Sequence, residues 1–172
     1  MLKLEDIWFQ PIKQMRNEEY SFLDNFITEK TYGNILEIGQ GGSTVILLDA
    51  TAHTFRKVVS IDLKFKLKDT MQYLPITYKN RLSIIQQDSK TYQTKEKFGC
   101  LLIDGDHYGN AVRKDTMNFW ENLEDDGYCI FHDYNLSKDV TKFVDDWVNK
   151  FKQAEYVTIQ NNLVVLQKCQ LG

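Results

Sequence analysis

The chain has 172 residues, of which 42% are hydrophobic and 26% are charged, a balance typical of a folded globular protein. This length accommodates one well-buried core and predicts a single domain over residues 1–172. The formal net charge is −3 and the basic residues are scattered, which disfavours nucleic acids and membrane surfaces as partners. Acidic Glu5 and Asp6 stand where a signal peptide needs basic residues, so we expect a soluble, cytoplasmic protein.

Apolar runs and amphipathic stretches alternate along the chain. Short runs rich in β-branched residues predict strands at residues 35–38, 58–61, 82–85, 101–103 and 128–131. Apolar residues at three- and four-residue spacing predict helices at about residues 16–30, 43–53, 64–73, 108–125 and 137–152. This alternation predicts a parallel sheet with helices on both faces.

Two stretches depart from that alternation. Residues 89–99 leave room for an abbreviated crossover helix between the third and fourth strands, or for none. Near the C-terminus, strand-like runs at residues 155–160 and 163–167 are separated by Asn161 and Asn162, a spacing that suits a hairpin turn. The sequence therefore predicts a three-layer, doubly wound α/β fold, whose seven-stranded sheet is mostly parallel and ends in an antiparallel hairpin strand.

A glycine-rich turn follows the first predicted strand. Residues 35–44 read ILEIGQGGST, so an apolar strand runs into a turn that contains Gly39, Gly41 and Gly42. Glycines allow the backbone to turn sharply and to approach a ligand closely. Ser43 or Thr44 is predicted to be the N-cap of the following helix.

Three further residues narrow the choice of ligand. Asp62 ends the next strand, where an acid accepts hydrogen bonds from both ribose hydroxyls of an adenosine. The turn departs from the dinucleotide-binding fingerprint, because Thr44 takes the third glycine position. Glu37 would repel a pyrophosphate, but it would suit S-adenosylmethionine, whose amino group and sulfonium are both cationic.

Together with the terminal hairpin, these features resemble the class I S-adenosylmethionine-dependent methyltransferases. The resemblance covers a Rossmann-like core at about residues 33–168, preceded by an N-terminal helical segment at residues 1–32. It implies that Asp88 reaches the exocyclic amine of adenine while Ser89 caps the following turn, although an Asx turn explains Asp88 equally well. The implied cofactor-binding residues are Glu37, Gly39, Gly41, Gly42, Ser43, Asp62, Asp88, Ser89 and Asp104.

A second motif follows the fourth predicted strand. Residues 103–107 read IDGDH and are similar to an element of a methyltransferase subfamily related to the catechol-type and sugar O-methyltransferases. The resemblance implies catalytic roles for Asp104, Asp106 and His107, with His107 as the general base. Asp106 either orients the His107 ring or points into solvent. His132 alternates with Asp133 along the chain, so we expect its side chain on the opposite face, in a structural role.

The same resemblance raises the question of a metal. In metal-dependent relatives, acids at the ends of the fourth and fifth strands hold Mg²⁺, and the matching residues here are Asp104 and Asp133. Tyr134 replaces the asparagine that commonly follows as the third ligand. The alternative is that both acids cap turns without a metal.

The resemblance implies an enzyme that transfers a methyl group from S-adenosylmethionine to an oxygen of a small molecule or sugar. Acceptor contacts are expected from residues 1–32, where Trp8, Phe9 and Tyr20 are the candidates unless they only pack against a helix. One alternative is a non-catalytic domain that binds S-adenosylmethionine or a partner. A nucleotide-dependent oxidoreductase is disfavoured by the motifs above. The sequence leaves a homodimer open.

Overall fold

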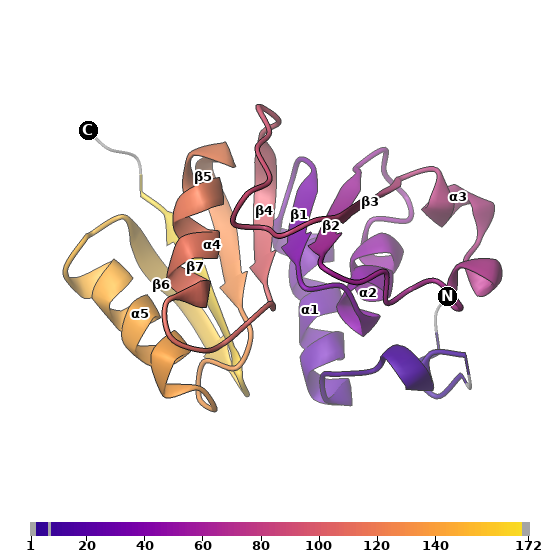
Figure 1. Cartoon of the computed structure of the whole chain (residues 1–172), viewed down its shortest axis with the longest axis horizontal. Helices are drawn as coiled ribbons and strands as arrows, with labels where there is room; N and C mark the ends of the chain where they lie inside the picture. Colours follow the sequence, from indigo (N-terminus) through magenta and orange to yellow (C-terminus); the bar gives the residue numbers. More distant parts are fainter. Residues whose placement is uncertain (1–2, 7, 170–172) are drawn as a thin grey trace.

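The computed structural model describes residues 3–6 and 8–169, so both ends of the predicted domain 1–172 lie outside the described residues. Its centre is a seven-stranded sheet in the order β3-β2-β1-β4-β5-β7-β6 (Figure 1). The strands are β1 (Ile35–Ile38), β2 (Val58–Asp62), β3 (Leu82–Gln86), β4 (Phe98–Ile103), β5 (Leu123–Phe131), β6 (Ala154–Gln160) and β7 (Leu163–Lys168).

The strand directions confirm the predicted fold class. Strands β1 to β5 pair in parallel, whereas β7 pairs antiparallel with both β5 and β6. Asn161 has a φ of 55° in the turn between β6 and β7, a left-handed conformation that asparagine tolerates better than most residues. The described residues between β3 and β4 form no helix. The sequence had left two alternatives for this crossover, a short helix or none, and the structure agrees with the second.

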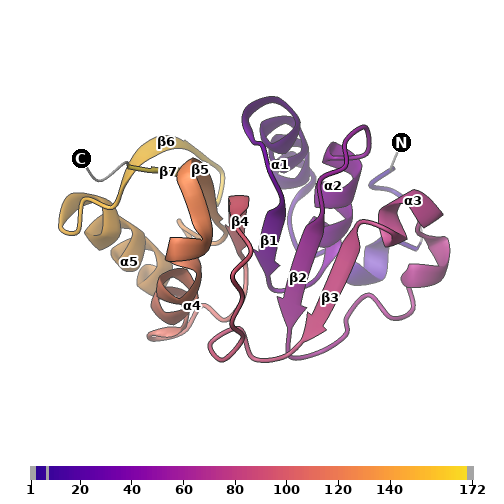
Figure 2. The same ribbon diagram turned by 90° about the horizontal axis from the view of Figure 1, so that it is seen from above.

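Helices cover both faces of the sheet (Figure 2). On one face, α1 (Asn17–Lys30) and α2 (Gly42–Ala50) pack with β-strand residues such as Ile35 and Leu102. On the other face, α4 (Ala111–Phe119) and α5 (Lys138–Asn149) pack with residues such as Leu36 and Leu101. Each pair of neighbouring strand residues therefore contributes one side chain to each core, as the alternation of a strand requires.

Two predicted helices differ from the structure. Residues 64–73 form turns and a single 3-10 turn at Met71–Tyr73, followed by the four-residue helix α3 (Ile76–Lys79). The backbone N–H of Leu67 donates to the side chain of Gln40, 3.0 Å away, instead of to a helical carbonyl. The helix predicted for residues 108–125 ends earlier, because β5 already begins at Leu123. Within the described residues, no helix is both long and apolar enough to cross a membrane.

Candidate active site

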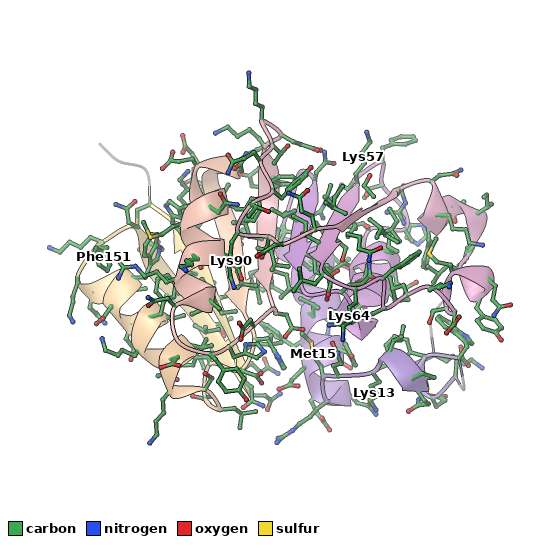
Figure 3. The ribbon with its side chains drawn as sticks, in the orientation of Figure 1. Lys13, Met15, Lys57, Lys64, Lys90 and Phe151 are labelled. Carbon is green, nitrogen blue, oxygen red and sulfur yellow. The ribbon has the colours of Figure 1, made fainter. Side chains whose placement is uncertain are left out.

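A cleft of about 290 Å³ opens beside β1, β2, β3 and β4, at the edge of the sheet where these strands end. Strand order reverses here, since β1 pairs with both β2 and β4, and open α/β sheets bind ligands at such a point. In Figure 3, Lys57 marks the start of β2 near the top and Lys64 marks its end in the lower half, so β2 runs downward in this view. Six predicted site residues line the cleft: Gly39, Asp62, Asp88, Ser89, Asp104 and Asp106.

Gly39 adopts a conformation that only glycine adopts readily. Its φ is +94°, and a Cβ at this position would collide with the backbone oxygen of Asp104. Its N–H donates to the carbonyl of Ile61 over 2.9 Å, and the N–H of Asp104 donates to the carbonyl of Ile38 over 2.8 Å. The turn is thereby fixed to the ends of β2 and β4 while its backbone stays open to the cleft.

Asp62 is held in place by several donors. Its carboxylate accepts hydrogen bonds from the backbone N–H groups of Gln40 and Lys64, both at 2.9 Å. The ammonium of Lys66 lies 2.9 Å from Oδ2. Although partial burial opposes ionisation, these donors hold the pKa of Asp62 below its usual value. Asp62 is therefore a fixed negative charge on the wall of the cleft.

Glu37 lies beneath the turn, not in the cleft. It is fully buried, and its carboxylate accepts hydrogen bonds from the hydroxyls of Ser43 (2.5 Å), Thr44 (2.5 Å) and Ser60 (2.6 Å). Burial raises the pKa of Glu37 to about 7, against the opposing effect of these three donors. The predicted N-cap role of Ser43 or Thr44 is wrong, because Gly41 occupies that position and both hydroxyls bond to Glu37.

Gly41 and Gly42 leave room for α1 and for the segment that precedes it. A Cβ on Gly41 would collide with the side chain of Gln14, and one on Gly42 would collide with the hydroxyl of Tyr20. That hydroxyl accepts hydrogen bonds from the backbone N–H groups of Gln14 (2.9 Å) and Met15 (3.1 Å). Tyr20 and Phe9 are fully buried and pack beside the turn. The third predicted candidate, Trp8, is partly buried against the same core and stacks on Tyr73.

The residues after β3 bond to their neighbours. Asp88 accepts a hydrogen bond from the backbone N–H of Lys90 at 3.0 Å, which is the Asx turn that the sequence left as an alternative. Ser89 donates to the carboxylate of Asp115 on α4, at 2.6 Å. Burial raises the pKa of Asp115, and the Ser89 hydroxyl opposes that rise. Asp88 and Ser89 both line the cleft.

Four side chains meet where β4 and β5 end. Nε2 of His107 lies 3.1 Å from Oδ2 of Asp133 and 3.9 Å from Oδ1 of Asp104. Nδ1 of His132 lies 2.9 Å from that same Oδ1 of Asp104 and 3.4 Å from Oδ1 of Asp133. The structure thus brings together Asp104, His107 and Asp133, which the sequence placed after the fourth and fifth strands, and it adds His132.

The position of His132 corrects the sequence prediction that it faces away from Asp133. Strand β5 ends at Phe131, and Asp133 has a φ of 59°, so the alternation of a strand no longer applies. Aspartate is among the residues that tolerate this left-handed conformation. The only sequence signal for this left-handed conformation is an aspartate directly after an apolar strand.

Asp106 lies apart from the His107 ring. Its Oδ1 accepts a hydrogen bond from the backbone N–H of Tyr108 at 3.1 Å, and its Oδ2 lies 4.0 Å from the ammonium of Lys90. Asp133 therefore makes the carboxylate contact with His107 that the sequence had suggested for Asp106. Of the two alternatives stated for Asp106, the structure supports the one in which its side chain points outward.

The cluster does not fit Mg²⁺. This ion prefers oxygen ligands in octahedral geometry, and among the described residues the candidate ligand group is Asp104, His107 and His132, with ligand atoms within 4.8 Å of one another. Two of these three residues offer nitrogen. The hydroxyl of Tyr134 points away, because it donates to a carboxylate on α5 over 2.7 Å.

A second hollow, of about 510 Å³, lies against His107 and Asp133. Tyr108 and Leu136 also line it, and they are 84% and 64% exposed respectively. Such exposure of large apolar side chains beside a polar pair is typical of a ligand-binding surface. We name this hollow the outer pocket.

A family model described as a methyltransferase domain matches residues 36–134, more than half of the chain. The chain belongs to this family. The matched segment begins in β1 and ends just after Asp133, so it contains every residue that lines the cleft and the whole cluster at the ends of β4 and β5. A search of curated proteins found no significant match.

Solved structures of methyltransferases share the fold. A protein provisionally named as a caffeoyl-CoA O-methyltransferase, from Staphylococcus aureus, is 16% identical, with 92% of this chain and 87% of that chain covered and a TM-score of 0.72. The N-methyltransferase NodS from Bradyrhizobium japonicum, in complex with S-adenosylhomocysteine, is 15% identical, with coverage of 97% and 91% and a TM-score of 0.64. An rRNA methylase from Streptococcus thermophilus is 18% identical, with coverage of 92% and 99% and a TM-score of 0.64.

Proposed function

We propose that this methyltransferase transfers a methyl group from S-adenosylmethionine to an oxygen of a small molecule or sugar. The observation that carries the proposal is the charge of the cleft at the edge of the sheet. Five carboxyl groups line it, from Asp62, Asp88, Asp104, Asp106 and Asp115, against the two cations of Lys66 and Lys90. A cationic sulfonium suits such a lining, whereas a pyrophosphate would be repelled.

In this proposal, Asp62 accepts hydrogen bonds from the ribose hydroxyls and Asp88 faces the adenine. Gly39 provides the open backbone along which the methionine end extends, toward Asp104. Glu37 acts indirectly, because its three hydroxyl partners hold the turn from beneath. When bound, S-adenosylmethionine supplies a methyl group that its sulfonium already activates for displacement.

The proposed acceptor site is the outer pocket. Tyr108 and Leu136 offer apolar contacts there, and His107 lies beside them with its Nε2 turned to Asp133. This contact orients the ring and leaves Nδ1 to accept the hydroxyl proton as the acceptor oxygen attacks the methyl carbon. A hydroxyl needs such a base more than an amine does, which favours an oxygen acceptor. The net charge of −3 disfavours a nucleic acid as the acceptor.

Titration calorimetry with S-adenosylhomocysteine and with NAD tests the cofactor. We expect S-adenosylhomocysteine to bind and NAD not to bind. Asp62→Asn should weaken the binding of S-adenosylhomocysteine roughly ten- to hundredfold, or about 1–3 kcal/mol, because it loses charged hydrogen bonds to the ribose. Asp69→Asn is the matched control, since Asp69 is exposed and lies outside the cleft. Binding of NAD alone would contradict the proposal.

Catalysis has a separate test. His107→Ala should lower the rate on an identified acceptor roughly a hundredfold or more, with the affinity for S-adenosylhomocysteine unchanged. His53→Ala is the control, because His53 is an exposed histidine far along the chain from the cluster. Full activity of the His107 variant would favour the other function, a domain that binds the cofactor without catalysis.

A further inference from the structure

Two histidine nitrogens and one carboxylate oxygen converge where β4 and β5 end. Among the described residues, Asp104, His107 and His132 each offer one ligand atom, and these atoms lie within 4.8 Å of one another. Nδ1 of His132 lies 2.9 Å, and Nε2 of His107 lies 3.9 Å, from Oδ1 of Asp104. In a tetrahedral site with bonds of about 2.0–2.1 Å, ligand atoms stand roughly 3.3 Å apart. The two measured separations lie on either side of this value, so modest side-chain movements place one ion between the three residues.

The chemistry of these ligand atoms selects the kind of ion. Imidazole nitrogen suits Zn²⁺ and its neighbours in the first transition row, whereas Mg²⁺ prefers oxygen. Two histidines and one carboxylate also match the zinc sites that keep a fourth position open. Asp133 adds a second carboxylate beside the cluster, because its oxygen atoms lie 3.1 Å from Nε2 of His107 and 3.4 Å from Nδ1 of His132. The cluster therefore combines nitrogen ligands with negative charge, as a nitrogen-preferring divalent ion requires.

The far side of the His132 ring gives an independent indication of a ligand. Its Nε2 is buried and has no hydrogen-bond partner among the described residues, but it lies 3.6 Å from Oε2 of Glu19. A carboxylate behind a histidine is the usual arrangement at metal sites, because a ring that binds an ion through one nitrogen carries its proton on the other. Glu19 is 1% exposed and accepts hydrogen bonds from the backbone N–H of Arg16 and the side-chain amide of Asn162, both at 2.8 Å. An ion on Nδ1 would therefore direct the N–H of Nε2 toward a carboxylate that is already fixed.

The cluster is open to solvent on the side of His107. The side chains of His107 and Asp133 are 28% and 20% exposed, and both line the outer pocket. Asp104 lines the cofactor cleft instead. The cluster therefore lies between the proposed acceptor site and the proposed cofactor site, and an ion can enter it through the outer pocket.

We propose that Asp104, His107 and His132 form a site for a nitrogen-preferring divalent ion such as Zn²⁺, and that this ion inhibits methyl transfer. The inhibition rests on the proposed function, in which Nδ1 of His107 accepts the proton of the acceptor hydroxyl. That role needs the ring's own proton on Nε2, where it faces Asp133. An ion on Nε2 moves this proton to Nδ1, so the ring can no longer accept another one.

The first experiment measures ion binding to the full chain, after dialysis against EDTA and removal of the chelator. Calorimetric titration with Zn²⁺ should show one ion per chain with a dissociation constant of about 1 μM or lower, and excess Mg²⁺ should not compete. His107→Asn removes a partly exposed ligand and should weaken this binding at least about tenfold. His53→Asn is the matched control, because His53 is an exposed histidine outside the cluster. No stoichiometric binding, or equal binding by the two variants, would overturn the inference.

A second experiment reports on the ring of His107. Nitrogen chemical shifts, assigned with His107→Asn, should place its proton on Nε2 in the ion-free protein at mildly alkaline pH, and on Nδ1 after one equivalent of Zn²⁺. A proton that stays on Nε2 contradicts the inference, as does a rate on an identified acceptor that rises with Zn²⁺. Calorimetry with S-adenosylhomocysteine on the ion-free sample separates the two proposals. Absent cofactor binding refutes the function and leaves the ion site standing, whereas cofactor binding without Zn²⁺ binding refutes only the ion site.

Discussion

The buried carboxyl group of Glu37 should make the stability of the protein fall as the pH rises. Because burial raises the pKa of Glu37 from 4.5 to about 7, the folded state holds this proton more tightly than the unfolded state does. The contribution of this proton to the free energy of unfolding is fully present below about pH 4.5 and is lost as the pH rises to about 7. Above about pH 7, Glu37 makes the free energy of unfolding change no further with pH. At 1.36 kcal/mol for each pH unit between the two pKa values, the loss is about 3 kcal/mol.

Glu37→Gln isolates this effect. The amide keeps the shape of the side chain and can donate to a rotatable hydroxyl of Ser43, Thr44 or Ser60, but it cannot ionise. Urea denaturation of both proteins across this pH range should show the variant gaining about 3 kcal/mol relative to the wild type as the pH rises. Glu29→Gln, at an exposed position, controls for the loss of one carboxyl group. Parallel stability curves for Glu37→Gln and the wild type would refute the reasoning.

Three further outcomes follow from the described contacts. Gly39→Ala should abolish binding of S-adenosylhomocysteine in calorimetry, because the added Cβ would collide with a backbone oxygen. The control Gly109→Ala should bind normally, because Gly109 also has a positive φ but has no atom within 4 Å of the added Cβ. Arg56→Ala should lower the free energy of unfolding in urea by about 2–3 kcal/mol, because the guanidinium donates to several carbonyl groups at the end of α1, and the exposed neighbour Lys57→Ala should have little effect. Tyr108→Ala should raise the KM for an identified acceptor with cofactor affinity unchanged, since Tyr108 lines the outer pocket and not the cleft.

Features set by local sequence were predictable. The hairpin between β6 and β7 follows from Asn161 and Asn162, because two residues cannot span a crossover and asparagine tolerates the left-handed turn. The turn at Gly39 follows from an apolar strand that runs directly into glycines. The start of β5 was missed, since Glu124, Asp125 and Gly127 are residue types depleted in strands and only pairing with β4 and β7 makes them part of one.

Features set by packing were not predictable. A glutamate before a glycine turn predicts a contact with the ligand. In the structure, however, Glu37 points to the α2 side of the sheet and is enclosed by hydroxyls. The orientation of His132 depends on the left-handed backbone conformation of Asp133. The third acid near its ring, Glu19, comes from α1, more than a hundred residues earlier. No spacing rule connects residues so distant in the sequence.

The cluster draws on parts of the chain that the family match does not cover. Glu19 precedes the matched residues 36–134 and Asn162 follows them, and their side chains are joined by a hydrogen bond of 2.8 Å behind His132. The backbone carbonyl of Asn162 also accepts a hydrogen bond from the backbone N–H of Tyr134, at 3.0 Å. The helix α1 and the terminal hairpin thus both support the backbone and the acid that fix His132. Parallel strands β4 and β5 bring Asp104 and Asp133 to one edge of the sheet. The helix α1 and the terminal hairpin then hold the residues around these two acids in place.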